Sequence, residues 1–73
     1  MQYQIKKWFN NNWYDIDIEN IRKDDVITVW KEDGTILPNA NGETISKVIK
    51  DAWLEDDIWK IESIPYLFKK YNN

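Results

Sequence analysis

The sequence predicts an α+β fold that is mainly β: a small twisted antiparallel sheet, or a partly open barrel, with one short helix. Several short segments alternate apolar and polar residues, polar turn residues separate them, and one segment alone has the spacing of an amphipathic helix. The 73 residues suffice for a single small domain spanning residues 1–73. Because so small a domain buries only about 60% of its unfolded surface, its five tryptophans must supply much of the buried apolar area.

The first predicted element is a hairpin in which residues 3–9 pair with residues 13–18. Residues 14–19 alternate strictly between polar or acidic side chains and isoleucine or tyrosine, as a half-buried strand does. The three asparagines at 10–12 form the turn. In residues 3–9, Trp8 falls on the opposite side from most of the apolar side chains.

A second hairpin follows a polar turn over residues 19–25. Residues 26–31 are β-branched and aromatic, Asp33-Gly34 is a strong tight-turn signal, and residues 35–37 form a short return strand. Asn41-Gly42 marks another turn.

The segment 44–54 is predicted to be a helix, with a strand as the alternative. Thr44 is suited to the N-cap. Its richness in β-branched residues favours a strand instead. The helix prediction depends on apolar residues at i, i+3, i+4, i+7 and i+8, namely Ile45, Val48, Ile49, Ala52 and Trp53.

Residues 58–62 form the last predicted strand, and the type of residues 66–71 is left open. Trp59 shares a strand face with Ile61, opposite charged neighbours, and is expected in the core. Trp53 is expected there too, from its place on the helical stripe.

Trp30 raises the main functional question. If Ile27 and Val29 face the core, Trp30 lies on the other face of its strand. One expectation is that the helix 44–54 covers and buries this face. The other is that Trp30 and Trp8 are exposed and form a partner-binding patch, since aromatic residues are favoured anchors at interfaces.

Two stretches carry resemblances. The run IRKDDVITV at 21–29, followed by Asp33-Gly34-Thr35, resembles the hairpin of SH3-like small barrels, with Asp24 where that family usually has glycine. With AWLEDDIWKIE at 52–62 it also resembles small uncharacterised phage or mobile-element proteins of low-GC bacteria. The abundance of isoleucine, asparagine and lysine fits AT-rich codons. These resemblances imply a fold and an origin, and no activity.

The side-chain inventory argues against an enzyme. Histidine and cysteine are absent, which removes the commonest bases, nucleophile pairs and transition-metal ligands. Asp15-x-Asp17-x-Glu19 looks like the start of a calcium loop, but Asn20 and Val26 occupy its glycine and glutamate positions. Alternation instead places the three acids on the solvent face of one strand. No cofactor or metal is therefore expected.

The cellular setting is inferred from what the sequence lacks. It has no cysteine, no secretory signal and no apolar run long enough to span a membrane. A cytoplasmic protein without a membrane partner is expected.

The predicted function is that of a small non-enzymatic protein-binding module, a phage or mobile-element inhibitor or adaptor of a host protein. The net charge is −3, and the acids lie in the middle of the chain. They would steer association with a basic partner. The expected partner-binding residues are Trp8, Trp30, Asp15, Asp17, Glu19, Asp24, Asp25, Glu55, Asp56 and Asp57.

Two alternatives remain. A small barrel that binds single-stranded nucleic acid would stack bases on Trp8, Trp30 or Tyr71, and lysines would follow the backbone. Those lysines are Lys6, Lys7, Lys69 and Lys70. The other alternative is a structural piece of a larger assembly, for which a stable homo-oligomer would be evidence.

Overall fold

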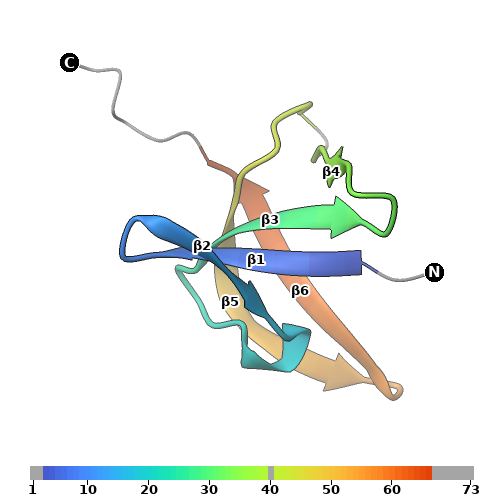
Figure 1. The fold of residues 1–73 in the computed structure, drawn as a ribbon. Helices are drawn as coiled ribbons and strands as arrows, with labels where there is room; N and C mark the ends of the chain where they lie inside the picture. Colours follow the sequence, from blue (N-terminus) through green and yellow to red (C-terminus); the bar gives the residue numbers. More distant parts are fainter. Residues whose placement is uncertain (1–2, 40, 67–73) are drawn as a thin grey trace.

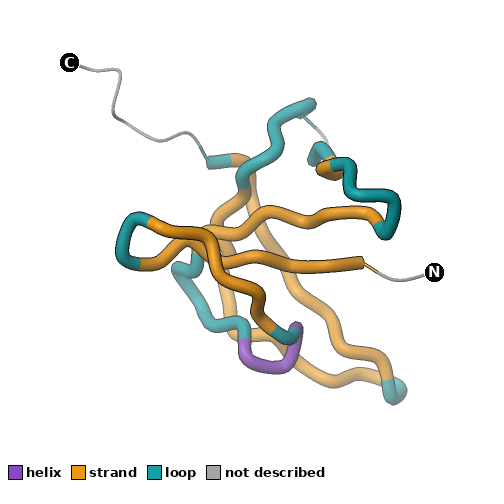
Figure 2. Tube along the Cα trace, viewed as in Figure 1, coloured by secondary structure: helices purple, strands orange, loops and turns teal. Residues whose placement is uncertain are grey.

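The computed structural model describes residues 3–39 and 41–66, which form one antiparallel sheet that does not close into a barrel (Figure 1). The strand order is β2-β1-β3-β5-β6, and β4 pairs with Val29 and Trp30 near the C-terminal end of β3. Strands make up nearly all the regular structure (Figure 2). The elements are β1 (Tyr3–Phe9), β2 (Asn12–Ile16), the 3-10 helix η1 (Ile18–Asn20), β3 (Val26–Lys31), β4 (Ile36–Leu37), β5 (Ser46–Glu55) and β6 (Ile58–Pro65).

Both predicted hairpins are present, but the bounds of the first differ: β2 ends at Ile16, and the turn is made by Asn10 and Asn11 because Asn12 pairs with Phe9 in the sheet. Asn10 and Asn11 join β1 to β2 with φ of 56° and 65°, the paired left-handed conformation of a type I′ turn. Asparagine and aspartate tolerate this conformation better than other non-glycine residues. Gly34, with φ of 91°, ends the turn between β3 and β4.

Asp24 also has a left-handed backbone, with φ of 76°. Aspartate adopts this conformation more readily than most other non-glycine residues, so the turn forms without a glycine. The Asp24 N–H donates to the carbonyl of Val48 at 2.8 Å, and the Val48 N–H donates to the carbonyl of Asp25 at 2.8 Å. These bonds tie the turn before β3 to β5.

The predicted helix over 44–54 is wrong, because this segment forms the strand β5, Ser46–Glu55. Its irregular apolar spacing comes from two register shifts, between Val48 and Lys50 and between Lys50 and Trp53. Each shift moves the side-chain alternation out of a strict period of two. Spacing that mimics a helical stripe is therefore produced by a bulged strand rich in β-branched residues.

The core is small and lies under the curved sheet. Ile21, Ile27 and Val48 are almost fully buried. They are surrounded by partly buried apolar residues, namely Ile5, Ile16, Ile18, Val29, Ala52 and Ile61. Ile21 follows η1, and its carbonyl accepts a hydrogen bond from the Ala52 N–H at 3.1 Å, which holds η1 against β5.

Two tryptophans predicted in the core lie at its edge. Trp59 is 38% exposed although it shares the face of Ile61, because it lies near the end of the long β5–β6 hairpin, beyond the reach of the core. Trp53 is half-buried; its indole N–H donates to Glu55 Oε1 at 3.0 Å, and Lys50 Nζ lies 4.2 Å from the centre of one of its rings. Both side chains therefore contribute more to the surface of the β5–β6 hairpin than to the core.

Candidate interaction surface

One face of the sheet gathers three of the five tryptophans. In antiparallel pairing, residues opposite each other share a face. Trp8 pairs with Trp13, and Gln4 pairs with Trp30. Since Gln4 and Trp8 lie on the same side of β1, the three indoles belong to one face, which we call the aromatic face.

Trp8 and Trp13 form a contacting pair across the first hairpin. Their ring centroids are 5.1 Å apart and the rings are tilted by 58°, within the range that aromatic pairs favour. Both side chains are half-buried. Trp13 was not among the residues predicted for the interface, yet a two-residue asparagine turn would have placed it opposite Trp8.

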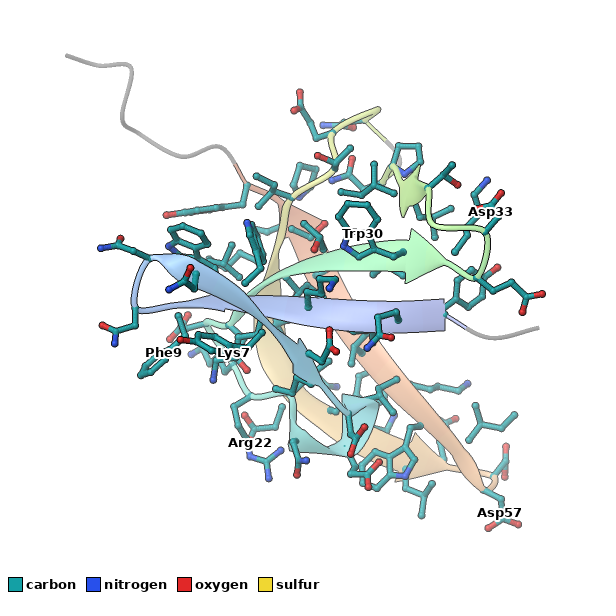
Figure 3. All side chains as sticks on the ribbon, in the orientation of Figure 1. Lys7, Phe9, Arg22, Trp30, Asp33 and Asp57 are labelled. Carbon is teal, nitrogen blue, oxygen red and sulfur yellow. The ribbon has the colours of Figure 1, made fainter. Side chains whose placement is uncertain are left out.

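Trp30 is neither covered by a helix nor fully exposed. It is half-buried, and its indole N–H donates to Thr28 Oγ1 at 3.0 Å. Thr28 is buried at 4% exposure, so this bond anchors the indole to the sheet. Trp30 lies over β3, between that strand and the segment that carries β4 (Figure 3). A large aromatic surface is thus held in one orientation beside solvent.

An open groove runs beside Trp30. Its volume of about 700 Å³ falls in the range of small-molecule and peptide sites. The lining residues are Tyr3, Gln4, Lys6, Trp13, Trp30, Lys31, Glu32 and Gly34. We call this feature the aromatic groove, because Tyr3, Trp13 and Trp30 supply its large apolar side chains.

The charges along the aromatic groove nearly balance. Lys6 Nζ lies 3.2 Å from Asp15 Oδ1, and this lysine occupies the middle of the face. Lys31 is followed by Glu32, and both line the groove. The groove therefore offers apolar contact and hydrogen-bonding groups without a strong field of either sign.

Lys7 projects from β1 to the opposite face, away from the aromatic groove. Its Nζ lies 3.2 Å from Asp25 Oδ1 and 5.7 Å from the centre of the Phe9 ring. Phe9 in turn contacts Tyr14, with centroids 6.4 Å apart. Figure 3 shows Lys7 and Phe9 together at the first hairpin, apart from Trp30. The side chains of Lys6 and Lys7 therefore lie on opposite faces of the sheet.

Several of the predicted acids have structural roles. Asp25 Oδ2 accepts the Arg22 N–H at 2.8 Å, and Asp24 Oδ1 lies 3.7 Å from Lys47 Nζ. Asp56 and Asp57 occupy the turn between β5 and β6, with φ of 54° and 64°. These four carboxylates belong to turns, so the turn chemistry is sufficient to account for their positions.

The three acids expected on one strand are not on one strand. Asp15 lies in β2, Asp17 precedes η1, and Glu19 is within η1, because the chain leaves the sheet after Ile16. All three acids are exposed. Asp15 belongs to the aromatic face through its ion pair, whereas Asp17 and Glu19 lie beside η1.

Glu55 lies beside Asp56 and Asp57 at the far end of the β5–β6 hairpin, where Figure 3 shows Asp57 well away from Trp30. The predicted partner-binding residues thus divide into the aromatic face and separate acidic turns. Lys69, Lys70 and Tyr71, which the nucleic-acid alternative invoked, lie outside the described residues.

One carboxylate has a clearly shifted pKa. The Thr35 hydroxyl donates to Asp33 Oδ1 at 2.7 Å and the Thr35 N–H donates to the same oxygen at 3.0 Å. These bonds favour the ionised form and lower the pKa of Asp33, and Lys31 adds a smaller effect in the same direction. Asp33 closes the turn at the end of the aromatic groove, so its role is structural.

Among residues 3–39 and 41–66, no cluster of three or more carboxylates is arranged to hold a metal ion. The same residues contain no helix with the length and apolar character needed to cross a membrane. Comparison of the chain with protein-family models, with curated proteins and with solved structures finds no match.

Proposed function

We propose that this protein is a non-enzymatic protein-binding module that holds an extended apolar segment of a basic protein in its aromatic groove. The observation that carries the proposal is the convergence of Trp13, Trp30 and Tyr3 on one open groove. Tryptophan and tyrosine are the residues that most often dominate binding energy at interfaces. The Trp30 indole is already fixed by Thr28, so binding would cost little additional side-chain entropy.

An extended peptide suits the groove better than a compact ligand. The groove is an open surface groove lined by residues of β1, β2, β3 and the turn after β3, and aromatic-lined grooves accept extended segments by contact with apolar side chains. The exposed side chain of Gln4, which lines the groove, can bond the peptide backbone. The partner would be a basic protein, because the chain as a whole carries a net charge of −3.

The charge balance favours a protein over single-stranded nucleic acid. A groove that follows a phosphate backbone needs a line of free cations. Here Lys6 is engaged by Asp15, and Lys7 faces the other side of the sheet, where Asp25 engages it. Among the described residues, the remaining groove cation is Lys31, which Glu32 follows, so base stacking on Trp30 would gain little of the electrostatic contribution that dominates affinity for nucleic acid.

The sequence resemblance supports the proposed origin, and the aromatic groove supports the proposed role. A phage or mobile element of a low-GC bacterium would encode this module as an inhibitor or adaptor of a host protein in the cytoplasm. Its small size and its lack of histidine and cysteine are in keeping with a protein that acts by occupying a surface.

The proposal is tested by capture from lysate of a low-GC bacterium, with and without nuclease treatment, using three tagged proteins: the natural sequence, Trp30→Ala and Phe9→Ala. Phe9 is the matched control, since it is an exposed aromatic residue on the opposite face of the sheet. A protein retained by the natural sequence and by Phe9→Ala, and lost with Trp30→Ala, is the expected result. Equal retention by all three would contradict the groove as the binding site, and material lost on nuclease treatment would favour the nucleic-acid alternative.

A further inference from the structure

The strand β6 forms one edge of the sheet. Its residues 58–64 complement a second, antiparallel copy of themselves in charge and in apolar character. Within the described residues it pairs only with β5. Every residue of β6 except Ile61 is exposed, including Ile58 at 60% and Ile64 at 48%. A long exposed edge with apolar side chains is a template for pairing with another strand.

The backbone groups that β6 presents outward can be identified from its turn. A two-residue turn joins Glu55 to Ile58, so this pair exchanges both of its hydrogen bonds within the hairpin. Backbone orientation then alternates along the strand, which turns the N–H and C=O groups of Trp59, Ile61 and Ser63 away from β5.

The pairing of Val48 supports this alternation independently. Val48 lies opposite Ser63, yet its N–H and C=O are bonded to Asp25 and Asp24. The pair Val48 and Ser63 is therefore a non-hydrogen-bonded pair, and Ser63 points its backbone groups outward as the turn predicts.

We propose that two copies of this chain associate through antiparallel pairing of their β6 strands, in the register that places Ile61 opposite the partner's Ile61. In this register the outward-facing residues meet one another: Ile61 opposite Ile61, and Trp59 opposite Ser63 in both directions. Each of these three pairs can exchange two backbone hydrogen bonds. The result is a two-fold symmetric interface made by the same strand on both chains.

The side chains select this register over its neighbours. Lys60 lies opposite the partner's Glu62 twice, and Ile58 lies opposite the partner's Ile64 twice. A shift centred on Glu62 would place Glu62 opposite itself, and a shift centred on Lys60 would place two lysines together, both of which are destabilising. A register whose two-fold axis falls between two residues would place residues whose backbone N–H and C=O point toward the partner opposite residues whose groups point toward β5. Such pairs cannot form their hydrogen bonds.

This inference goes beyond the proposed function and does not rest on it, since the aromatic groove is built from β1, β2, β3 and the turn that follows β3. The two sites lie on different strands, so failure of one leaves the other untouched.

Sedimentation of four samples over a range of concentrations tests the interface. The natural sequence is expected to reach a monomer–dimer equilibrium. Lys60→Glu alone and Glu62→Lys alone each place like charges opposite one another twice, which should raise the dissociation constant about tenfold or more. An equal mixture of the two variants restores opposite charges at both positions, and should dimerise at least ten times more tightly than either alone.

Three results would overturn the inference: a natural sequence that stays monomeric throughout, a dimer unaffected by either substitution, or a mixture no tighter than its components. Amide hydrogen exchange on the natural sequence gives a second measurement that needs no variant. Exchange at Trp59, Ile61 and Ser63 should slow as concentration rises, and more steeply than at Lys60 and Glu62, whose N–H groups point toward β5 in the monomer as well. Exchange that is independent of concentration at all five amides would equally overturn it.

Discussion

The Asp33 carboxylate stabilises the turn beside the aromatic groove by accepting hydrogen bonds from Thr35. Two hydrogen bonds from Thr35 stabilise the Asp33 carboxylate. Because folding lowers the pKa of Asp33, the carboxylate contributes to stability above its ordinary pKa. That contribution is lost as the pH falls through the lowered value.

An NMR titration of the Asp33 carboxyl carbon measures this effect. The midpoint should lie below that of an ordinary aspartate. Thr35→Val removes the hydroxyl and leaves the backbone N–H, so the midpoint should move part of the way upward. Identical midpoints in the two proteins would show that the Thr35 hydroxyl has no influence on Asp33.

The small core makes individual apolar residues important. Ile27 is 1% exposed at the centre of the core, so Ile27→Ala should lower the free energy of unfolding by about 2–4 kcal/mol. That is a large share of the roughly 4–10 kcal/mol expected for a chain of this length. Leu54→Ala, at a side chain 55% exposed, is the control and should cost less than about 1 kcal/mol.

Urea unfolding of the two variants beside the natural sequence gives both values. Equal losses for Ile27→Ala and Leu54→Ala would contradict the placement of the core.

At the scale of elements, the turns were the most predictable part of the fold. Asparagine pairs and Asp-Gly have a direct backbone reason to occur where φ is positive, and that reason can be read locally. The strand β5 could not be predicted in the same way. Its two bulges are set by pairing with β6, and they give its apolar residues a spacing that suits a helix equally well.

The turn between β5 and β6 contains an avoidable strain. Asp57 has φ of 64°, a conformation that glycine adopts without cost. Asp57→Gly should therefore raise the free energy of unfolding by up to about 1 kcal/mol, because Asp-Gly is among the best sequences for a type I′ turn.

Gly34→Ala, at φ of 91°, is the opposite change and should lower stability. Thermal or urea unfolding of both variants checks the signs. A decrease for Asp57→Gly would mean that the aspartate side chain contributes more than the backbone conformation costs.

The candidate site was predictable in part for the same physical reason. Trp8 and Trp30 fall off the core face by simple alternation along their strands, and the structure places both on one face. Trp13 joins them only through the register set by the asparagine turn. The groove itself could not be foreseen, since it depends on the pairing of β1 with β3, which brings Gln4 opposite Trp30.

At the scale of the whole molecule, some acidic residues lie outside the aromatic groove and can attract a basic partner without touching it in the complex. Asp17 and Glu19 are exposed beside η1 and do not line the aromatic groove, although they border a neighbouring hollow with Tyr3 and Gln4. Asp15 is engaged by Lys6, which does line the groove. Charges outside a contact act mainly on the rate of association. Reversal of Asp17 and Glu19 to lysine should therefore slow binding to a basic partner.

Stopped-flow association with the captured partner protein measures this effect. At low ionic strength we expect a decrease of several-fold in the association rate with little change in dissociation. The difference should fade at high salt, where the Debye length falls to about 3 Å at 1 M. An unchanged rate at low salt would show that these acids do not steer the partner.

Binding at the aromatic groove is tested most directly by calorimetry of the captured partner protein with the natural sequence, Trp30→Ala and Phe9→Ala. A groove anchored by Trp30 predicts a loss of about 2 kcal/mol or more for Trp30→Ala, and a change within about 0.5 kcal/mol for Phe9→Ala. Equal affinities for all three proteins, or a larger loss with Phe9→Ala, would contradict it.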